Sequence, residues 1–452
     1  MMNTLRNSEQ KQAFEMRSLK KQTASTVKKV AVARSAKKTA LVICILSLLI
    51  YSHCKPDAQV NTGDSRQESI NQLFADYDQQ FQQLLANAVA AVGKETIRLE
   101  PLSDRFTVPK KLTISGTAYE IGYTIGHISN QFNHTPKQVS ESKKQLNQQI
   151  IQMYQKIYPQ YLEILGGIGV SFDMTVDEMD LSYMEFNFFI ELWWYLLKYD
   201  QFSTLTNFAK GDGIPTNNNC SIASYFTGEH HLIGRNFDNP SDRPHYFTTS
   251  QMQGAYKMKG HSVYNLYHWV VDGMNEKGLS MNCATNGEEY FWEDPYPNEP
   301  AVFSGHMSRI VMDTCATVDE AIEKIGSAKI WFPNEGLHWV ISDASGKSVV
   351  VEFDQDRNMV VLDKPGNYEL MTNTALQKGE EYLNQTCFRY NRAKPMLKAG
   401  LQTMDDMLSV MDSIHFSSGS TRTLWTLIMD IKTRSFEVYY RKEYHKKYSF
   451  SF

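Results

Sequence analysis

Cys220 stands at the head of a predicted β-hairpin and constrains this chain more than any other residue. The apolar run 220–226 reads as a strand, turn residues follow, and 231–238 reads as the returning strand. Because strands joined by a tight turn pair with each other, the hairpin is expected to bring Arg235 and Asp238 close to the thiol. A thiol beside a guanidinium and a carboxylate indicates nucleophilic chemistry.

The chain is long enough for two or three domains and has a globular composition, with 452 residues of which 42% are hydrophobic. Its charge is unevenly placed. Residues 1–55 carry 11 basic and 2 acidic side chains, whereas the remainder carries 35 basic and 48 acidic ones. The acidic body argues against nucleic-acid binding, and no nucleic-acid partner is expected.

The basic head is followed by an apolar run at 40–50, which indicates membrane targeting. The run is shorter than the roughly 20 residues of a spanning helix and fits a secretory signal better. The segment before Cys54 resembles a lipoprotein processing site, although Tyr51 and His53 depart from that pattern. An uncleaved signal anchor is the alternative, and Met16 could be the true start. Either way, we expect an exported protein, periplasmic or at the cell surface, that is anchored to the membrane through its N-terminus.

The cysteines do not form a metal-binding pattern. Of six, Cys44 and Cys54 lie in the targeting segment, Cys220 heads the hairpin, and the other three show no zinc spacing. The chain also lacks a His-Glu-x-x-His sequence. We therefore expect no metal site and no cofactor.

Changes in composition and in hydrophobic pattern along the chain suggest four parts. These are a basic N-region with a signal or lipoprotein-type anchor at 1–54, a linker and helix at 55–110, a helical segment at 111–219, and a β-rich domain at 220–452. Within the third part, Gly116, Gly122 and Gly126 suggest close packing or tight backbone, and a Gly/Asn-rich loop ends just before Cys220.

After Cys220 the sequence predicts many short strands separated by a few helices. The predicted strands are 220–226, 231–236, 262–271, 278–284, 338–343, 347–354, 358–362, 368–373, 424–431 and 435–441; the predicted helices are 301–314, 317–325, 388–399 and 403–412. This pattern is typical of an α+β domain of sheets covered by helices. Residues 239–260 and 287–300 are interpreted as loops around a pocket.

Several segments resemble the choloylglycine hydrolases in family order. They are 220–238, 272–279, 337–352, 371–373 and 389–392. Upstream, 116–126 and 161–168 resemble the pro-region of penicillin acyltransferase-like autoproteolytic enzymes; acid ceramidase and N-acylethanolamine-hydrolysing amidase share the plan of a pro-segment before the cysteine. The resemblance implies an α+β fold, an αββα four-layer Ntn-hydrolase sandwich preceded by a helical pro-segment, and self-cleavage between Asn219 and Cys220.

The resemblance also implies roles for individual residues. Asp238 would hold the α-amine that cleavage frees, Arg235 would support the same corner, Asn373 would be an oxyanion donor, and Arg389 would position the Cys220 region.

A second polar donor is expected shortly after Leu279. The family has an asparagine there, at a position that falls on Thr285 in this chain. A one-residue bulge would bring Asn286 into the site, so Asn286 is the predicted donor, with Thr285 and Asn282 as alternatives.

The chemistry follows from the residue types. A cysteine at a new N-terminus has its own base, because an α-amine has a pKa of about 7.7–8.0 and can accept the thiol proton. We therefore expect cleavage of a linear non-peptide amide with an apolar acyl group through a thioester on Cys220. The alternatives are acyl transfer to an amine, or an inactive surface-anchored binding homologue. The upstream segment is the expected protein partner, and the sequence does not indicate an oligomeric state.

Overall fold

The computed structural model describes residues 81–101, 110–196, 220–239, 245–263, 267–286, 296, 298–332, 336–364, 366–418 and 421–452. The chain divides into two units, 1–67 and 68–452, and all described residues belong to the second. The predicted N-region, its anchor at Cys54, and Asn219 lie outside the described ranges. Within those ranges, no helix combines the length and the apolarity needed to cross a membrane.

Two sheets form the framework of the second unit. The larger has nine described strands in the order β1-β2-β5-β6-β7-β8-β11-β12-β13, and the smaller has the order β14-β3-β4-β16-β17-β18, with β15 paired to β16. The bounds in the larger sheet are β1 Ile97–Pro101, β2 Lys110–Gly116, β5 His245–Met252, β6 Met258–Val263, β7 Val270–Asn275, β8 Ser280–Thr285, β11 Leu337–Ser342, β12 Ser348–Phe353 and β13 Met359–Asp363. Those in the smaller sheet are β3 Ser221–Phe226, β4 His231–Asn239, β14 Tyr368–Met371, β15 Ser417–Ser418, β16 Thr421–Asp430, β17 Ser435–Tyr440 and β18 Tyr448–Ser451.

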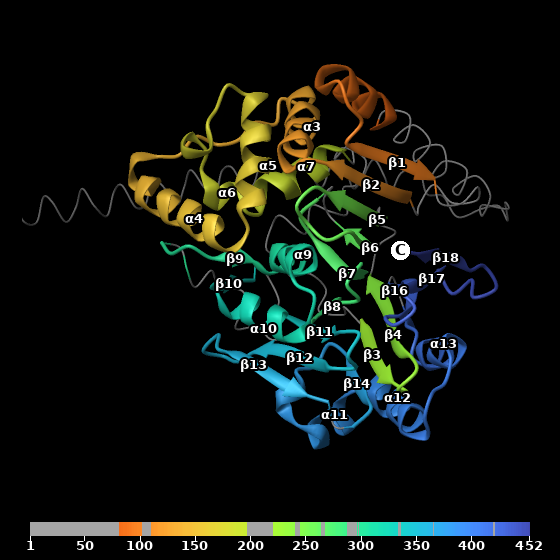
Figure 1. Cartoon of the computed structure of the whole chain (residues 1–452). Helices are drawn as coiled ribbons and strands as arrows, with labels where there is room; N and C mark the ends of the chain where they lie inside the picture. The colour runs from red at the N-terminus through yellow and green to blue at the C-terminus, as the bar shows by residue number, and fades with distance from the viewer. Residues whose placement is uncertain are drawn as a thin grey trace, which may run out of the picture. The chain divides into compact units, whose positions relative to one another are not determined.

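The sheets face each other, and helices cover their outer faces. Ser342 of β11 donates to Ser224 of β3 at 3.3 Å, which joins the inner faces. Helices α9 (Ser304–Thr314) and α10 (Val318–Gly326) lie against the larger sheet, while α12 (Phe388–Ala399) and α13 (Met404–Ser413) lie against the smaller one (Figure 1). The expected α+β arrangement, with four layers in the order αββα, is confirmed.

The remaining elements connect these layers. A short parallel pair, β9 (Val302–Phe303) and β10 (Ile330–Trp331), flanks α9 and α10, and α11 (Glu380–Thr386) precedes α12.

The segment before Cys220 is part of the larger sheet. Strand β2 pairs in parallel with β5, with Lys110 opposite Tyr246 and Gly116 opposite Met252, and β1 pairs with β2. Its helices are a helix at 81–92, α3 (Ala118–Gln131), α4 (Lys144–Ile157), α5 (Pro159–Val170), α6 (Leu181–Met184) and α7 (Asn187–Leu196). Helix α3 contacts β2 and α5, and Figure 1 shows α4 and α6 farther from β1 and β2 than α3. We call residues 81–101 and 110–196 the upstream segment.

Two sequence expectations after Cys220 are wrong. Residues 262–271, predicted as one strand, span the end of β6 and the start of β7. Residues 239–260, interpreted as a pocket loop, contain all of β5 and the start of β6. The polar and aromatic residues of β5 resemble loop composition, but residues 246–252 pair with β2 and residues 245–250 pair with β6.

Glycines allow α3 and α5 to approach backbone to backbone, as the sequence suggested. A Cβ added to Gly122 would lie 2.0 Å from the carbonyl oxygen of Ile164, and one added to Gly167 would lie 2.2 Å from that of Tyr119. A Cβ added to Gly126 would lie 2.7 Å from the carbonyl oxygen of Ile168. Real side chains do not approach backbone so closely, so this helix pair depends on these glycines.

Gly167→Ala is therefore expected to lower the thermal midpoint, because overpacking typically costs about 1–3 kcal/mol. Its neighbour Gly166 provides the control, since a Cβ there meets nothing closer than 3.9 Å. Gly166→Ala should leave the midpoint unchanged or raise it, because alanine favours helix over glycine. Calorimetry of the three proteins tests this, and equal midpoints for both variants would contradict the packing argument.

Candidate active site

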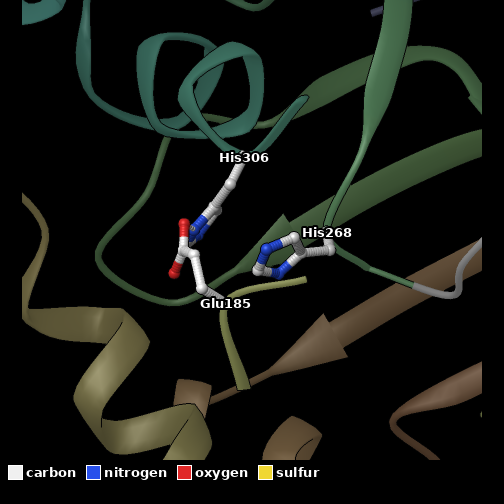
Figure 2. Close-up of side chains that lie close together, drawn as sticks. All are labelled: Glu185, His268 and His306. Atoms are coloured by element: carbon white, nitrogen blue, oxygen red, sulfur yellow. Dashed lines mark hydrogen bonds and ion pairs between the residues drawn. The ribbon is translucent and has the colours of Figure 1, made fainter. Parts of the chain in front are cut away.

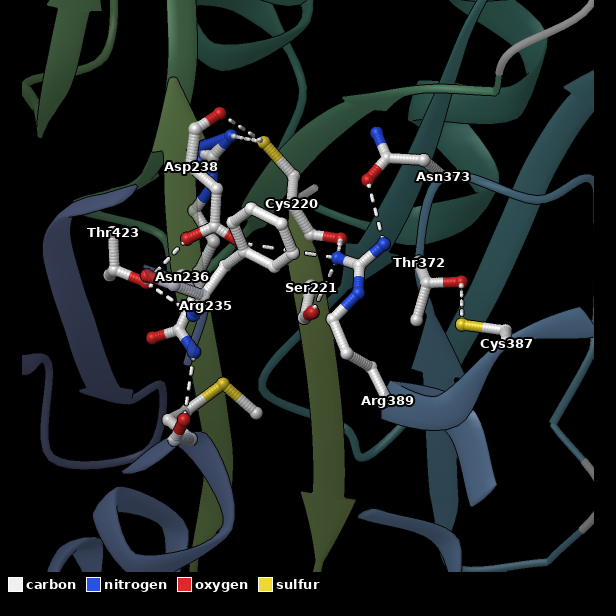
Figure 3. A network of polar contacts seen from close by, with 12 residues as sticks. Cys220, Ser221, Arg235, Asn236, Asp238, Thr372, Asn373, Cys387, Arg389 and Thr423 are labelled. Carbon is white, nitrogen blue, oxygen red and sulfur yellow. Dashed lines mark hydrogen bonds and ion pairs between the residues drawn. The ribbon is translucent and has the colours of Figure 1, made fainter. Parts of the chain in front are cut away.

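Cys220 lies at the start of β3, buried between the two sheets. The hairpin pairs Ile222 with Arg235 and Ser221 with Asn236, so Cys220 falls beside the far end of β4. Its Sγ is 3.7 Å from Arg235 Nη2 and 4.0 Å from the backbone carbonyl oxygen of Asp238 (Figure 3). The hairpin thus brings the thiol and the guanidinium together, as the sequence predicted.

Strand alternation separates the side chains of β4 onto two faces. Arg235 points toward the larger sheet, where it reaches Asp272 of β7, whereas Asn236 points outward and donates to Met411 of α13. Asp238 shares the outward face with Asn236. Its carboxylate therefore contacts Thr423, and only its carbonyl faces the sulfur.

Arg235 is held by a buried ion pair. Its Nη1 donates to Asp272 Oδ2 at 2.6 Å, and its Nη2 donates to the carbonyl of Cys283 at 2.9 Å. Asp272 also accepts from Trp425 Nε1 and from the backbone and ring nitrogens of His261. Burial alone would raise the pKa of Asp272, but the neighbouring His261 and Arg235 outweigh it and lower this pKa. The guanidinium therefore stays fixed beside the sulfur.

The Cys220 thiol keeps its proton near neutral pH. Burial raises its pKa, and the positive charge of Arg235 offsets this only in part. A nucleophilic Cys220 therefore needs a base that accepts the thiol proton.

The two carboxylate oxygens of Asp238 differ in their hydrogen bonding. Its Oδ1 accepts from Thr423 at 2.5 Å. Its Oδ2 is buried, lies 4.0 Å from Arg389 Nη1, and accepts no hydrogen bond from the residues that the structure describes. Burial raises the pKa of Asp238 to about 7. The open oxygen is suited to a further donor.

Arg389 and Asn373 connect the head of β3 to the end of β8. Arg389, in α12, donates from Nη1 to the carbonyl of Cys220 at 2.5 Å and to Ser221 Oγ at 3.0 Å, and from Nη2 to Asn373 Oδ1 at 3.2 Å. Asn373 Nδ2 donates to the carbonyl and the hydroxyl of Thr285 at 2.8 and 3.0 Å. This series of hydrogen bonds fixes the position of the Asn373 amide relative to Cys220.

Of the three candidates for the second donor, Thr285 is the one whose contacts reach Asn373. Asn282 lies within β8 and donates to Ser280 at 2.9 Å. Asn286 is buried just after β8, and its backbone N–H donates to the carbonyl of Gly336 at 2.8 Å. Asn286 as a donor to a substrate remains a prediction.

A buried His–Glu pair holds the chain on both sides of Asn373. His338 Nε2 lies 2.7 Å from the carbonyl of Thr372, and its Nδ1 lies 2.9 Å from Glu352 Oε1. Glu352 in turn accepts from the backbone N–H groups of Leu376 and Gln377. The pair therefore sets the backbone from which the Asn373 amide projects.

Sequence reasoning missed these supporting residues to different degrees. Asp272 is the first residue of the motif 272–279, and His338 and Glu352 lie in the motif 337–352. The motifs therefore pointed to these residues, but the sequence did not show what each of them does. Thr423 and Trp425 carried no signal, because their part in the site appears only when β16 pairs with β4.

A separate group of side chains has metal-ligating chemistry. Glu185, His268 and His306 are buried, and the ligand atoms that they offer lie within 4.8 Å of one another (Figure 2). These residues are far apart in the sequence, and no spacing rule could have grouped them.

Residues 220–378 match the sequence model of the linear amide C-N hydrolases, choloylglycine hydrolase family. A penicillin V acylase of Pectobacterium atrosepticum is 34% identical over 115 residues, which cover 23% of this chain and 30% of that protein. A bile salt hydrolase/transferase of Clostridium perfringens is 31% identical over 155 residues, 32% of this chain and 45% of that protein. The chain thus spans less than half the length of these curated relatives.

Solved structures with similar parts include the conjugated bile acid hydrolase of Clostridium perfringens and the penicillin V acylase of Agrobacterium tumefaciens. A mutant of the first has a TM-score of 0.42 at 19% identity and covers 52% of this chain and 92% of that one. The second has a TM-score of 0.39 at 17% identity and covers 51% and 84%.

We expect the free energy of unfolding to depend on pH because folding raises the pKa of Asp238. Its pKa rises from an ordinary 3.8 to about 7 on folding, so between these values the folded state holds a proton that the unfolded state has lost. The free energy of unfolding should fall as pH rises through this range, by at most about 1.4 kcal/mol per pH unit. Asn cannot titrate. In a Cys220→Ala background, Asp238→Asn should therefore gain stability over its parent from about pH 4 to 7.

Denaturant titrations at several pH values measure this difference. Asp319→Asn, at an exposed aspartate outside the site, is the matched control for removal of a carboxylate. Parallel curves for Asp238→Asn and its parent would refute the raised pKa.

Proposed function

We propose that the chain is an exported, self-processing cysteine hydrolase, and the proposal proceeds from the match of residues 220–378 to the linear amide C-N hydrolases, choloylglycine hydrolase family. The chain would cleave a linear non-peptide amide through a thioester on Cys220. The observation that carries the proposal is the position of the Cys220 sulfur, buried at the start of β3 and 3.7 Å from Arg235 Nη2.

The first step is removal of the peptide bond that blocks the α-amine of Cys220. The thiol attacks the carbonyl carbon of Asn219, the bond to the Cys220 nitrogen breaks, and that nitrogen takes up the thiol proton. Water then hydrolyses the resulting thioester, which leaves a carboxylate on Asn219 and a free thiol and α-amine on Cys220.

Turnover then uses the α-amine as the base that the thiol needs. It accepts the thiol proton, the thiolate attacks the amide carbonyl, and the ammonium returns the proton to the departing amine. Water, deprotonated by the same α-amine, hydrolyses the thioester to a carboxylic acid and restores the thiol.

The surrounding residues have roles that their contacts support. Asp238 Oδ2, which accepts no hydrogen bond from the described residues, would accept one from the α-ammonium. Arg235, fixed by Asp272, orients the sulfur. Asn373 would donate to the oxyanion once its amide releases Thr285, and Arg389 holds both Cys220 and Asn373 in place.

The substrate is proposed only as a class. The relatives are named for penicillin V and for bile salts, and both names are compatible with an amide that carries an apolar acyl group. Acyl transfer to an amine is the alternative reaction, and hydroxylamine or a primary amine added during turnover would trap the acyl group if it operates.

Export and anchoring are further parts of the proposal. They rest on the basic head, the apolar run 40–50 and Cys54. Fractionation of cells that carry Cys54→Ala tests lipidation, because a lipidated protein should leave the membrane fraction when Cys54 is replaced. Retention of the variant there would favour an uncleaved anchor.

Intact mass and N-terminal sequencing of the purified protein test self-processing. Two fragments are expected, one of which begins at Cys220, and Cys220→Ala should give one uncut chain because it lacks the nucleophile. The fragments should stay together on a native sizing column, since β2 pairs with β5 across the cut.

A single folded chain in both proteins would refute self-processing. If the wild type is cut but an acyl probe does not label Cys220, the inactive binding homologue becomes the better account.

Asn373→Ala should lower kcat about 100- to 1000-fold, as loss of an oxyanion donor does, with a smaller effect on KM. Asn384→Ala, at an exposed position in α11, is the matched control and should retain activity. Steady-state kinetics on processed protein give both constants. An unchanged kcat in processed Asn373→Ala would exclude this residue from oxyanion stabilisation.

A further inference from the structure

Three metal-ligating side chains meet where the upstream segment packs against the body of the protein. Glu185 follows α6, His268 precedes β7, and His306 lies in α9. Their exposed fractions are 5%, 1% and 0%. Figure 2 shows the carboxylate and the two imidazole rings turned toward one another.

The distances suit a shared ion. Glu185 Oε1 and His306 Nδ1 are 3.0 Å apart, close to the separation of two donors bound to one zinc ion at about 2.0–2.2 Å each. The ligand atoms of all three residues lie within 4.8 Å of one another. The ring of His268 stacks on that of His306, with centroids 3.9 Å apart, and ion binding would turn it so that one of its nitrogens faces the carboxylate.

The carboxylate is already oriented by groups outside the cluster. Tyr154 donates its hydroxyl to Glu185 Oε2 at 2.5 Å, and the backbone N–H of Phe303 donates to Oε1 at 2.9 Å. Such outer contacts hold the ligands of metal sites in position. Oε1 also faces His306 Nδ1.

The contact between Glu185 and His306 is one that a metal ion can replace. The Glu185–His306 contact requires a proton between the two atoms, and a divalent ion would take its place and release it to solvent. His306 Nε2 is also buried without a hydrogen bond to any described residue. The ring therefore offers a nitrogen to an ion whichever way it is turned.

The nearby cation does not oppose this arrangement strongly. Arg309, one turn after His306 in α9, is neutralised by Asp313, which accepts from its Nε at 2.8 Å. Asp313 also accepts from the hydroxyl of Tyr158, the residue between α4 and α5. The positive charge of Arg309 is thus balanced by Asp313.

We propose that Glu185, His268 and His306 bind one divalent first-row transition ion, with Zn²⁺ as the best match to two imidazoles and a carboxylate. The site is structural: it joins Glu185 of the upstream segment to His268 and His306 of the body. The sequence predicted no metal site. The proposal does not rest on the proposed enzymatic function.

The test uses the full chain with Cys220→Ala, which lacks the thiol at that position. After chelation and re-equilibration with Zn²⁺, atomic emission should find about one more equivalent of zinc than in the same chain with His306→Gln. His415→Gln, at a partly exposed histidine outside the cluster, is the control and should retain the ion. Equal zinc contents in parent and His306→Gln would overturn the proposal.

A second variant and a spectrum keep the test decisive if His306→Gln does not fold. Glu185→Gln retains oxygen and nitrogen atoms for Tyr154 and Phe303 and should also lose the ion. With Co²⁺ in place of zinc, the parent should show weak visible bands without an intense thiolate band. A thiolate band, or no stoichiometric binding by the folded parent, would refute the site.

Discussion

The buried ion pair between Arg235 and Asp272 is the interaction on which the arrangement of the site depends. It crosses from the smaller sheet to the larger one, and both groups are almost completely inaccessible to solvent. A buried guanidinium without a partner would be very unfavourable, so Asp272 fixes both the spacing of the sheets and the direction of Arg235. Trp425 and His261 complete the carboxylate's shell. The guanidinium of Arg235 is therefore held beside the sulfur of Cys220.

The second level of organisation is the chain of contacts from Arg389 to Asn373 and Thr285. It ties the first residues of β3 to α12, to the loop after β14 and to the end of β8. His338 and Glu352 add a support behind that loop. Reactive and supporting groups therefore come from both sheets, and their geometry depends on how the sheets face each other.

Sequence reasoning found the groups that lie close to Cys220 along the chain or inside recognisable motifs. The hairpin explains why Arg235 could be placed beside the thiol. Strand alternation explains why the carboxylate of Asp238 lies on the other face, a distinction that residue types alone do not make. The many short strands in the sequence predicted the layered fold. Strand β5 was not predicted, because its polar residues are typical of a loop. Thr423, Trp425 and the Glu185, His268 and His306 cluster exist only through tertiary packing.

The parallel pairing of β2 with β5 has a consequence for the order in which the protein is made. Lys110 leaves the ribosome long before its partner Tyr246, so β2 has an open edge while the intervening chain is synthesised. Helices α3 and α5, joined through Gly122 and Gly167, are complete before that point and give the early chain a local packing partner. Synthesis from the N-terminus therefore makes the helical support well before the strand that pairs with β2.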